Sequence, residues 1–208
     1  VVTHPGGGVK EQCSSLYAWN LARNGYVALA FDASHQGESE GMPRCLEDPT
    51  SRVEDIRSAV DYLTSLKYVD GGRIGAMGIC AGGGYTINAI QTEFRIKAAA
   101  AISTWDVGDS AKNGFPGVDI PDFMHKLLKE VADARTSEAR GGKAAYWHYV
   151  PESEADIDEN TSTIQKEAYE YYRTDRCFYP TSVNKYLVSS NDKLAAWDAF
   201  AHIDTVSP

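Results

Sequence analysis

The stretch Arg73-Ile-Gly-Ala-Met-Gly-Ile-Cys-Ala-Gly-Gly-Gly-Tyr85 organises the rest of the chain. A short apolar run, Ile74 to Ile79, leads into Cys80, and a cluster of glycines separates that cysteine from an apolar helical pattern that includes Tyr85. Apolar runs on both sides of a glycine-rich break predict a strand, a sharp turn and a helix. Cys80 is expected to occupy the turn itself.

The spacing Gly78-x-Cys80-x-Gly82 fits a nucleophile elbow. In that motif the reactive side chain sits on a strained turn, and small neighbours allow backbone segments to close around it. The other reading of the same residues is a buried structural cysteine in a glycine-rich turn, because free cysteines are often small core residues.

Composition and charge limit the classes of protein that need to be considered. The chain has 208 residues, 43% of them hydrophobic, which suits one domain or a domain with a large insertion. A formal charge of -9 without a local basic cluster argues against a nucleic-acid partner. The longest apolar stretches, residues 26–31 and 98–102, are too short to span a bilayer, and we expect a soluble protein without a membrane partner.

The cysteines and the two chain ends carry further expectations. Cys13, Cys45, Cys80 and Cys177 form no Cys-x-x-Cys pair and have no histidine at metal-ligand spacing, which predicts no metal, no cofactor and a reducing, cytoplasmic setting. The sequence starts without methionine inside an apparent strand and stops at Pro208. It therefore reads as an excerpt of a longer protein.

The first half alternates strands with helices. Strands are expected at residues 1–4, 26–32, 74–79 and 96–103, and helices at 12–24, 51–63 and 81–91, the second of them opened by the capping box Ser51-x-x-Glu54. This alternation predicts an α/β fold with a doubly wound, mostly parallel sheet.

Two polar loops follow predicted strands. His4-Pro-Gly-Gly-Gly8 leaves backbone N–H groups accessible to a ligand, and Asp32 to Gly41 lies at the carboxyl end of a strand, where open α/β sheets bind ligands. His35 in the second loop is a candidate site-lining residue, although a histidine there can equally hydrogen-bond only within its loop. Asp32 is expected to order that loop.

After residue 104 the alternation stops. A loop is expected at residues 108–121, then a helix that ends before Gly141, a solvated acidic segment at 152–159, a helix near 164–172 and a last helix from Asn191 that carries Leu194, Trp197 and Phe200. We expect a core at residues 1–104, a helical cap or insertion at 105–203 and the start of a return to the core at 204–208. Aromatic residues of the insertion line a substrate pocket or its own core: Tyr146, Trp147, Tyr149, Tyr169, Tyr171, Tyr172 and Phe178.

With these segments in place, the chain resembles the α/β-hydrolase superfamily, and within it the dienelactone hydrolase-like enzymes and their capped relatives. The resemblance rests on the ordered set of the His4–Gly8 loop, the Asp32-x-x-His-x-Gly-x-Ser-x-Gly41 loop, the Cys80 elbow and the helical insertion. It implies a hydrolase that attacks ester, lactone or thioester bonds of a small-molecule acyl substrate. Dienelactone hydrolases carry cysteine at the elbow, which makes Cys80 the implied nucleophile.

The chemistry of such a site assigns further residues. A cysteine at a helix N-terminus is expected to have a lowered thiol pKa, because the helix dipole favours the thiolate. The oxyanion that forms on attack needs donors already in place; these are the backbone N–H of Ala81 and that of Gly6 or Gly7.

The catalytic acid and histidine are the main departure from the superfamily. They normally follow the nucleophile in later loops, and the chain stops at residues 204–208, about where the strand before the acid is expected. Asp106 is a substitute acid or site-lining residue, or a structural one. The substitute bases are His125, His148 and His202, each of which can equally be a surface or packing histidine.

Three further expectations concern alternative functions and self-association. The first alternative to an enzyme is a noncatalytic binding or scaffolding module that retains the fold. Nucleotide binding is disfavoured because no Gly-x-Gly-x-x-Gly lies at a strand-helix turn. A parallel sheet without its outer strands exposes unpaired edges, which predicts an aggregation-prone chain or a homo-oligomer.

Overall fold

The structure is a computed structural model and describes residues 1–114 and 120–206. Its centre is a parallel sheet in the order β1 (Val2–Thr3), β2 (Ile74–Ile79) and β3 (Ile96–Ile102). Val2 pairs with Met77, and Gly78 pairs with Ala101. The predicted parallel α/β architecture is confirmed, and the carboxyl ends of β1 and β2 lie at one edge of this sheet.

The strand predicted at residues 26–32 is much shorter than expected. A single parallel bridge joins Ala30 to Val2, and the Val2 N–H donates to the Leu29 carbonyl at 2.8 Å. Tyr26 and Val27 before it are 66% and 47% exposed. Because β1 contains only two residues, it offers this segment too few partners for a continuous ladder.

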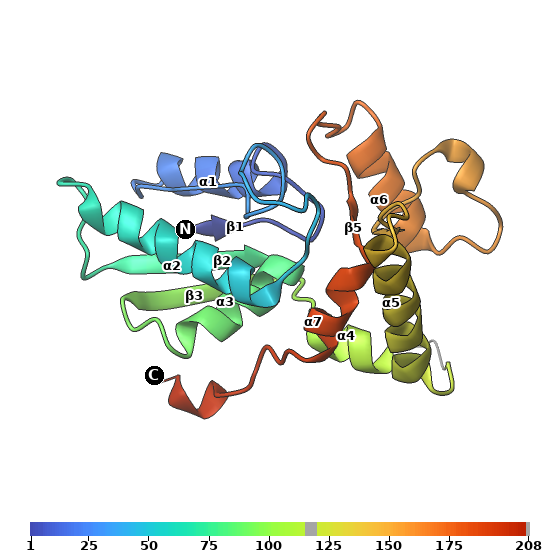
Figure 1. Ribbon diagram of the computed structural model, residues 1–208. Coiled ribbons are helices and arrows are strands. Elements are labelled where there is room, and N and C mark those ends of the chain that lie inside the picture. Colours follow the sequence, from blue (N-terminus) through green and yellow to red (C-terminus); the bar gives the residue numbers. More distant parts are fainter. Residues whose placement is uncertain (115–119, 207–208) are drawn as a thin grey trace.

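Three helices accompany the sheet: α1 (Cys13–Arg23), α2 (Pro49–Ser65) and α3 (Ala81–Ile90). In Figure 1, α2 and α3 lie side by side in front of the strands, and α1 lies beyond β1. The predicted capping box at Ser51 is wrong. Asp48 caps α2, since its carboxylate accepts the Thr50 N–H at 3.0 Å, and Glu54 pairs with Arg57 instead.

The apolar core lies between α2, α3 and the helices of the second half. Ile56 of α2 and Tyr85 of α3 are fully buried and pack with Leu127 and Leu194 in one cluster. β3 is different, because its residues from Lys97 to Ala101 are exposed and it pairs only with β2 among the described residues. The sheet therefore has an open edge at β3.

The second half begins with a helix that the sequence did not predict. The segment 108–121 was expected to be a loop, but α4 (Val107–Asn113) covers its start, and residues 115–119 lie outside the described part. Asp106 initiates α4, because its side chain accepts the backbone N–H groups of Gly108 and Asp109. α5 (Phe123–Ala139) follows and ends before Gly141, as predicted.

A small antiparallel sheet lies within the second half and was also missed. It joins β4 (Tyr146–His148) to β5 (Lys185–Leu187). Between them lie η1 (Glu154–Asp156) and the predicted helix α6 (Thr163–Arg173), and after them come η2 (Val188–Ser190), α7 (Asn191–Ala195) and η3 (Ile203–Thr205). The last predicted helix is therefore too long, since α7 stops at Ala195 and leaves Trp197 and Phe200 outside.

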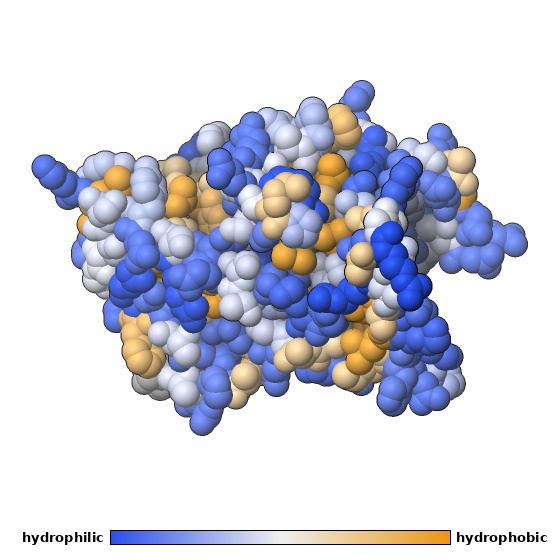
Figure 2. All heavy atoms as spheres, viewed as in Figure 1, coloured by the Kyte–Doolittle hydropathy of each residue, from blue (hydrophilic) through white to orange (hydrophobic). Residues whose placement is uncertain are grey.

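The two halves form neighbouring parts of one molecule. Figure 1 shows the sheet with α1, α2 and α3 on one side of the view and α5, α6 and β5 on the other. Apolar side chains gather near the middle of the face in Figure 2, while polar side chains dominate its margins. Within residues 1–114 and 120–206, no helix combines the length and apolar character needed to cross a bilayer.

Candidate active site

Cys80 occupies a strained backbone conformation between β2 and α3. Its φ and ψ are 56° and -122°, values that non-glycine residues rarely adopt. The neighbouring strand holds it there, since the Cys80 N–H donates to the Ile102 carbonyl at 2.9 Å and the Cys80 carbonyl accepts the Trp105 N–H at 3.0 Å. Such strain costs about 1–3 kcal/mol and persists where surrounding structure enforces it, often at functional sites.

The glycines around Cys80 are required by close packing. A Cβ atom on Gly78 would lie 2.5 Å from Thr86 Oγ1 and still closer to the Gly82 carbonyl oxygen. A Cβ atom on Gly82 would lie 2.6 Å from the Thr3 carbonyl oxygen and 2.7 Å from that of His4. The turn thus has the tight geometry that the sequence predicts, with the His4 loop packed directly against it.

The environment of the Cys80 thiol combines opposing effects. Burial is the largest and raises the thiol pKa above its usual value. The Ala81 N–H, the Arg52 charge and the Gly6 N–H act against it, whereas the Glu47 charge adds to it. The expected lowering of the pKa is therefore wrong for this structure, because loss of solvent outweighs the donors at the helix N-terminus.

The second half of the chain covers the glycine loop. The ring of Tyr149 lies so close that Cβ atoms on Gly6 and Gly7 would approach it to 2.9 and 2.5 Å. Asn184 Nδ2 donates to the Gly7 carbonyl at 3.0 Å, and Ser182 Oγ donates to the same oxygen at 3.2 Å. Tyr149, Ser182 and Asn184 of the second half therefore hold the loop in place.

A buried polar network lies beneath this contact, and the sequence interpretation missed it. Glu47 is fully buried and accepts the Tyr85 hydroxyl at 2.7 Å and the Tyr149 hydroxyl at 3.4 Å. Arg52 Nε lies 3.4 Å from the same carboxylate, and its guanidinium stacks over the Tyr85 ring. One signal was present: Arg52 falls four residues before Ile56, on the apolar face of its helix.

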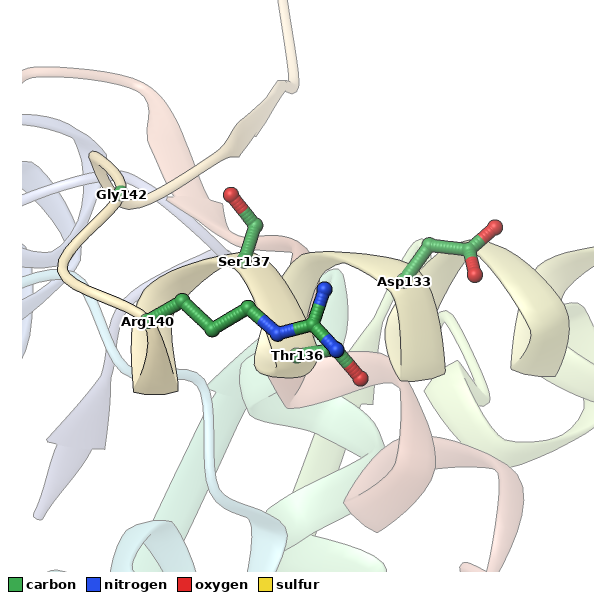
Figure 3. A pocket seen from close by; sticks show the side chains of 5 residues that line it. All are labelled: Asp133, Thr136, Ser137, Arg140 and Gly142. Carbon is green, nitrogen blue, oxygen red and sulfur yellow. The ribbon is translucent and has the colours of Figure 1, made fainter.

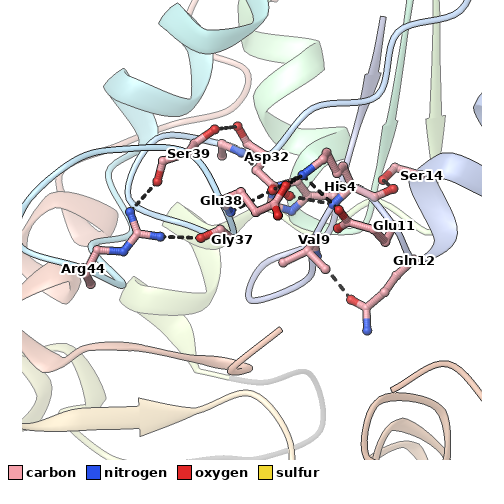
Figure 4. A network of polar contacts seen from close by, with 12 residues as sticks. His4, Val9, Glu11, Gln12, Ser14, Asp32, Gly37, Glu38, Ser39 and Arg44 are labelled. Carbon is pink, nitrogen blue, oxygen red and sulfur yellow. Dashed lines mark hydrogen bonds and ion pairs between the residues drawn. The ribbon is translucent and has the colours of Figure 1, made fainter. Parts of the chain in front are cut away.

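A second polar network holds the outer side of the glycine loop (Figure 4). Asp32 accepts the Lys10 N–H at 2.7 Å and the Glu38 N–H at 2.9 Å, so it orders its loop as expected. Lys10 Nζ lies 2.8 Å from Asp32, 2.6 Å from Glu38 and 2.9 Å from Glu11. These three carboxylates could in principle surround a cation, but the Lys10 ammonium already occupies that position.

The remaining candidate residues have local roles in the structure. His35 Nδ1 lies 3.0 Å from the Pro43 carbonyl, within its own loop, and Asp106 is the N-cap of α4. His125, His148 and His202 are exposed, and His148 lies 3.4 Å from Glu152. Between the described residues, no hydrogen bond joins a histidine ring to Cys80.

The surroundings of the thiol include residues from both halves. Burial first, and then the charges of Cys177 and Cys80, raise the pKa of the Cys13 thiol to about 11. Tyr172 of α6 also feels the charges of Cys13 and Cys80, after its own burial, and its pKa is raised. Of the aromatic residues considered for a pocket, Tyr149 and Tyr172 are the ones that these contacts bring to the thiol and its loop.

Two surface hollows lie away from the thiol. One, of about 460 Å³, is at the end of α5 and is lined by Asp133, Thr136, Ser137, Arg140 and Gly142 (Figure 3). The other, of about 440 Å³, lies along α6 and includes Tyr171 and Tyr172. Of these two hollows, the one along α6 includes Tyr172, whose pKa is influenced by the Cys80 charge.

A strand, a strained turn and a helix in a parallel sheet form the nucleophile elbow that is typical of the α/β-hydrolase fold. An α/β hydrolase, GrgF from Penicillium sp. sh18, has the same fold: its structure matches with a TM-score of 0.78 at 23% identity, over 100% of this chain and 67% of GrgF. The chain belongs to the PET hydrolase-like family, whose model matches residues 1–140. The narrower resemblance to dienelactone hydrolase-like enzymes stays a prediction.

Two bacterial relatives match over more of the chain. The uncharacterized protein YcjY of Escherichia coli K12 is 44% identical over 201 residues, 96% of this chain and 64% of YcjY. The protein PA2218 of Pseudomonas aeruginosa is 35% identical over 184 residues, 88% of this chain and 48% of PA2218. The crystal structure of PA2218 matches with a TM-score of 0.91 at 31% identity, over 100% of this chain and 64% of that structure. The chain thus spans less than two thirds of the length of these relatives.

Proposed function

We propose that the protein hydrolyses ester, lactone or thioester bonds of a small-molecule acyl substrate, with Cys80 as nucleophile. One observation carries the proposal: Cys80 is held in a strained turn at φ 56°, and the His4 loop packs directly against that turn. The backbone N–H groups of Ala81 and Gly6 act to lower the pKa of its thiol, as donors near the sulfur would. Membership of a family named for a hydrolase supports the reaction class.

The two donors suit the charge that develops during acyl transfer. The Cys80 thiolate attacks the carbonyl carbon, a C–S bond forms, and the π electron pair moves onto the carbonyl oxygen. Donors held beside the sulfur lie close to that oxygen and stabilise its negative charge, which is usually the largest catalytic contribution. Gly6 suits the role better than Gly7, because the Gly6 N–H contributes to lowering the Cys80 thiol pKa and the Gly7 N–H does not figure among these effects.

The rest of the reaction follows from this intermediate. When the carbonyl re-forms, the bond to the alcohol or thiol leaving group breaks, and that group leaves with the electron pair and takes a proton. Water then attacks the acyl-cysteine, which releases the carboxylic acid and restores the thiol. Because burial raises the thiol pKa, the first step needs a proton acceptor. The resemblance to α/β hydrolases assigns that role to a histidine in a loop beyond the insertion.

Acylation with p-nitrophenyl acetate tests the proposal. Release of p-nitrophenolate should fall by about 10³-fold or more in Cys80→Ala, because a nucleophile acting within a catalytic group has effects of this size or larger. Cys177→Ala is the matched control, since it removes another half-buried free thiol of the same neighbourhood and should change the rate less than about threefold. Mass spectrometry should locate the acetyl group on Cys80.

The opposite result would favour the noncatalytic alternative. If Cys80→Ala releases p-nitrophenolate as fast as the unsubstituted protein, or if no acetyl group is found on Cys80, this residue is not the nucleophile.

A further inference from the structure

The Pro5–Gly6 peptide bond carries the proposed second oxyanion donor, the Gly6 N–H, in a loop that packs against the Cys80 turn, and contacts of the Pro5 carbonyl fix the orientation of this peptide. His4 Nδ1 lies 2.7 Å from the Pro5 carbonyl oxygen, and the Gly8 N–H donates to the same oxygen at 3.2 Å. In a trans peptide the C=O and N–H bonds point in opposite directions. Fixing the Pro5 oxygen toward the His4 ring therefore directs the Gly6 N–H away from that ring, and this N–H acts to lower the pKa of the Cys80 thiol.

The protonation of the His4 ring follows from its other contacts. Nε2 accepts the Ala33 N–H at 3.0 Å, and the Arg52 guanidinium lies 3.2 Å from Nε2 and 3.5 Å from Nδ1. Both of these groups are obligatory donors, so Nε2 must be unprotonated and the ring proton must be on Nδ1. Nδ1 is then the donor to Pro5, and the tautomer that holds the peptide is set by the protein.

The surroundings of the His4 ring also keep it from gaining a second proton. It is fully buried, and burial followed by the Arg52 charge lowers its pKa to about 3, against weaker opposing effects of the hydrogen bond to Pro5 and of the Asp32 charge. Arg52 Nη2 donates to the His4 carbonyl at 2.8 Å and so holds the backbone as well as the ring. His4 stays neutral at any ordinary working pH and is unsuited to proton transfer.

We propose that His4 is a positioning residue of the oxyanion hole: its Nδ1–H, hydrogen-bonded to the Pro5 carbonyl, aims the Gly6 N–H at the reacting oxygen. This inference rests on the proposed function, because it needs Cys80 to form a tetrahedral intermediate. It gives the buried network of Arg52 and Glu47 a role at the site, since that network holds the ring.

A matched pair of substitutions separates this role from simple packing. His4→Asn keeps an N–H at the place of Nδ1, whereas His4→Gln moves its amide toward the place of Nε2 and loses the donor to Pro5. The p-nitrophenyl acetate acylation rate should stay within about tenfold of wild type in His4→Asn and fall by about 10²-fold or more in His4→Gln, the usual cost of one oxyanion donor. Substrate affinity should change little, because the donor acts mainly on the transition state.

Alkylation by iodoacetamide supplies the readout that a packing defect would not reproduce. That reaction forms no oxyanion. Its limiting rate at high pH should therefore agree within about threefold among the unsubstituted protein, His4→Asn and His4→Gln. The thiol pKa read from the same pH profile should rise in His4→Gln, because a donor to the thiolate is lost. Equal acylation rates in His4→Asn and His4→Gln would overturn the proposal while leaving Cys80 as nucleophile. Absence of acylation at Cys80 in the unsubstituted protein would instead remove the proposed function and this role with it.

Nitrogen NMR of the unsubstituted protein tests the tautomer without any substitution. The proposal requires the ring proton of His4 to be on Nδ1 between about pH 6 and 8. A proton on Nε2 would overturn it, whether or not the variants fold.

Discussion

Replacement of Gly78 by alanine tests the packing on which the elbow depends. The new Cβ atom would lie 2.5 Å from Thr86 Oγ1 and closer still to the Gly82 carbonyl, and Thr86 is fully buried. The Gly82 carbonyl is backbone at the start of α3, so it cannot move without displacing α3 from β2. Overpacking of this kind costs about 1–3 kcal/mol, occasionally more, and we expect a loss of about 3 kcal/mol in the free energy of unfolding.

Gly75 is the control for this experiment, because it lies on the same strand three residues earlier. A Cβ atom there would meet its nearest neighbour, the Ala98 carbonyl oxygen, at an ordinary 3.6 Å. Gly75→Ala should therefore be neutral or stabilise by about 0.5 kcal/mol, since alanine loses less backbone entropy on folding. Urea unfolding followed by tryptophan fluorescence measures both. If the two variants differ by less than about 1 kcal/mol, the close approach of α3 to β2 is not what requires glycine.

Three further predictions concern charge and the sheet edge. The pKa of His4 is lowered to about 3 in the folded protein, so below about pH 6.5 the unfolded chain binds a proton that the folded chain does not. The free energy of unfolding should therefore decrease by about 1.4 kcal/mol for each unit that the pH is lowered between about pH 6 and 4. Urea unfolding curves of His4→Asn should lack this contribution. Glu47→Gln leaves the buried Arg52 without its counter-charge and should cost about 3–5 kcal/mol, whereas a cost below about 1 kcal/mol would show that the pair is not needed. The open edge of β3 should make the 208-residue chain self-associate, and Ala100→Lys should reduce this in light scattering; a monodisperse monomer would contradict it.

The elements around the elbow were predictable because their sequence signals are local. The strand at 74–79, the turn at Cys80 and the helix after it depend on residues that are adjacent in sequence, and α5 and α6 follow helical periodicity. The helix α4 was missed because its residues are mostly small and polar. Its start depends on one capping side chain, Asp106, which the sequence allows to serve in a site or a loop equally well.

The contacts that complete the candidate site could not be predicted in this way. Tyr149, Ser182 and Asn184 reach the glycine loop from positions far along the chain, and no periodicity links them to it. The thiol pKa was mispredicted for a related reason. The effect of a helix terminus can be inferred from local sequence, whereas burial depends on which distant segments cover the sulfur.

The hydrogen bond from Asn184 to the Gly7 carbonyl joins residues 177 positions apart, and that from Ser182 joins residues 175 apart. During synthesis the glycine loop therefore leaves the ribosome well before the two side chains that hold its Gly7 carbonyl. Closing so long a segment carries an entropic cost that local contacts avoid. A nascent chain would therefore present the Cys80 turn well before Ser182 and Asn184 hold its oxyanion loop in place.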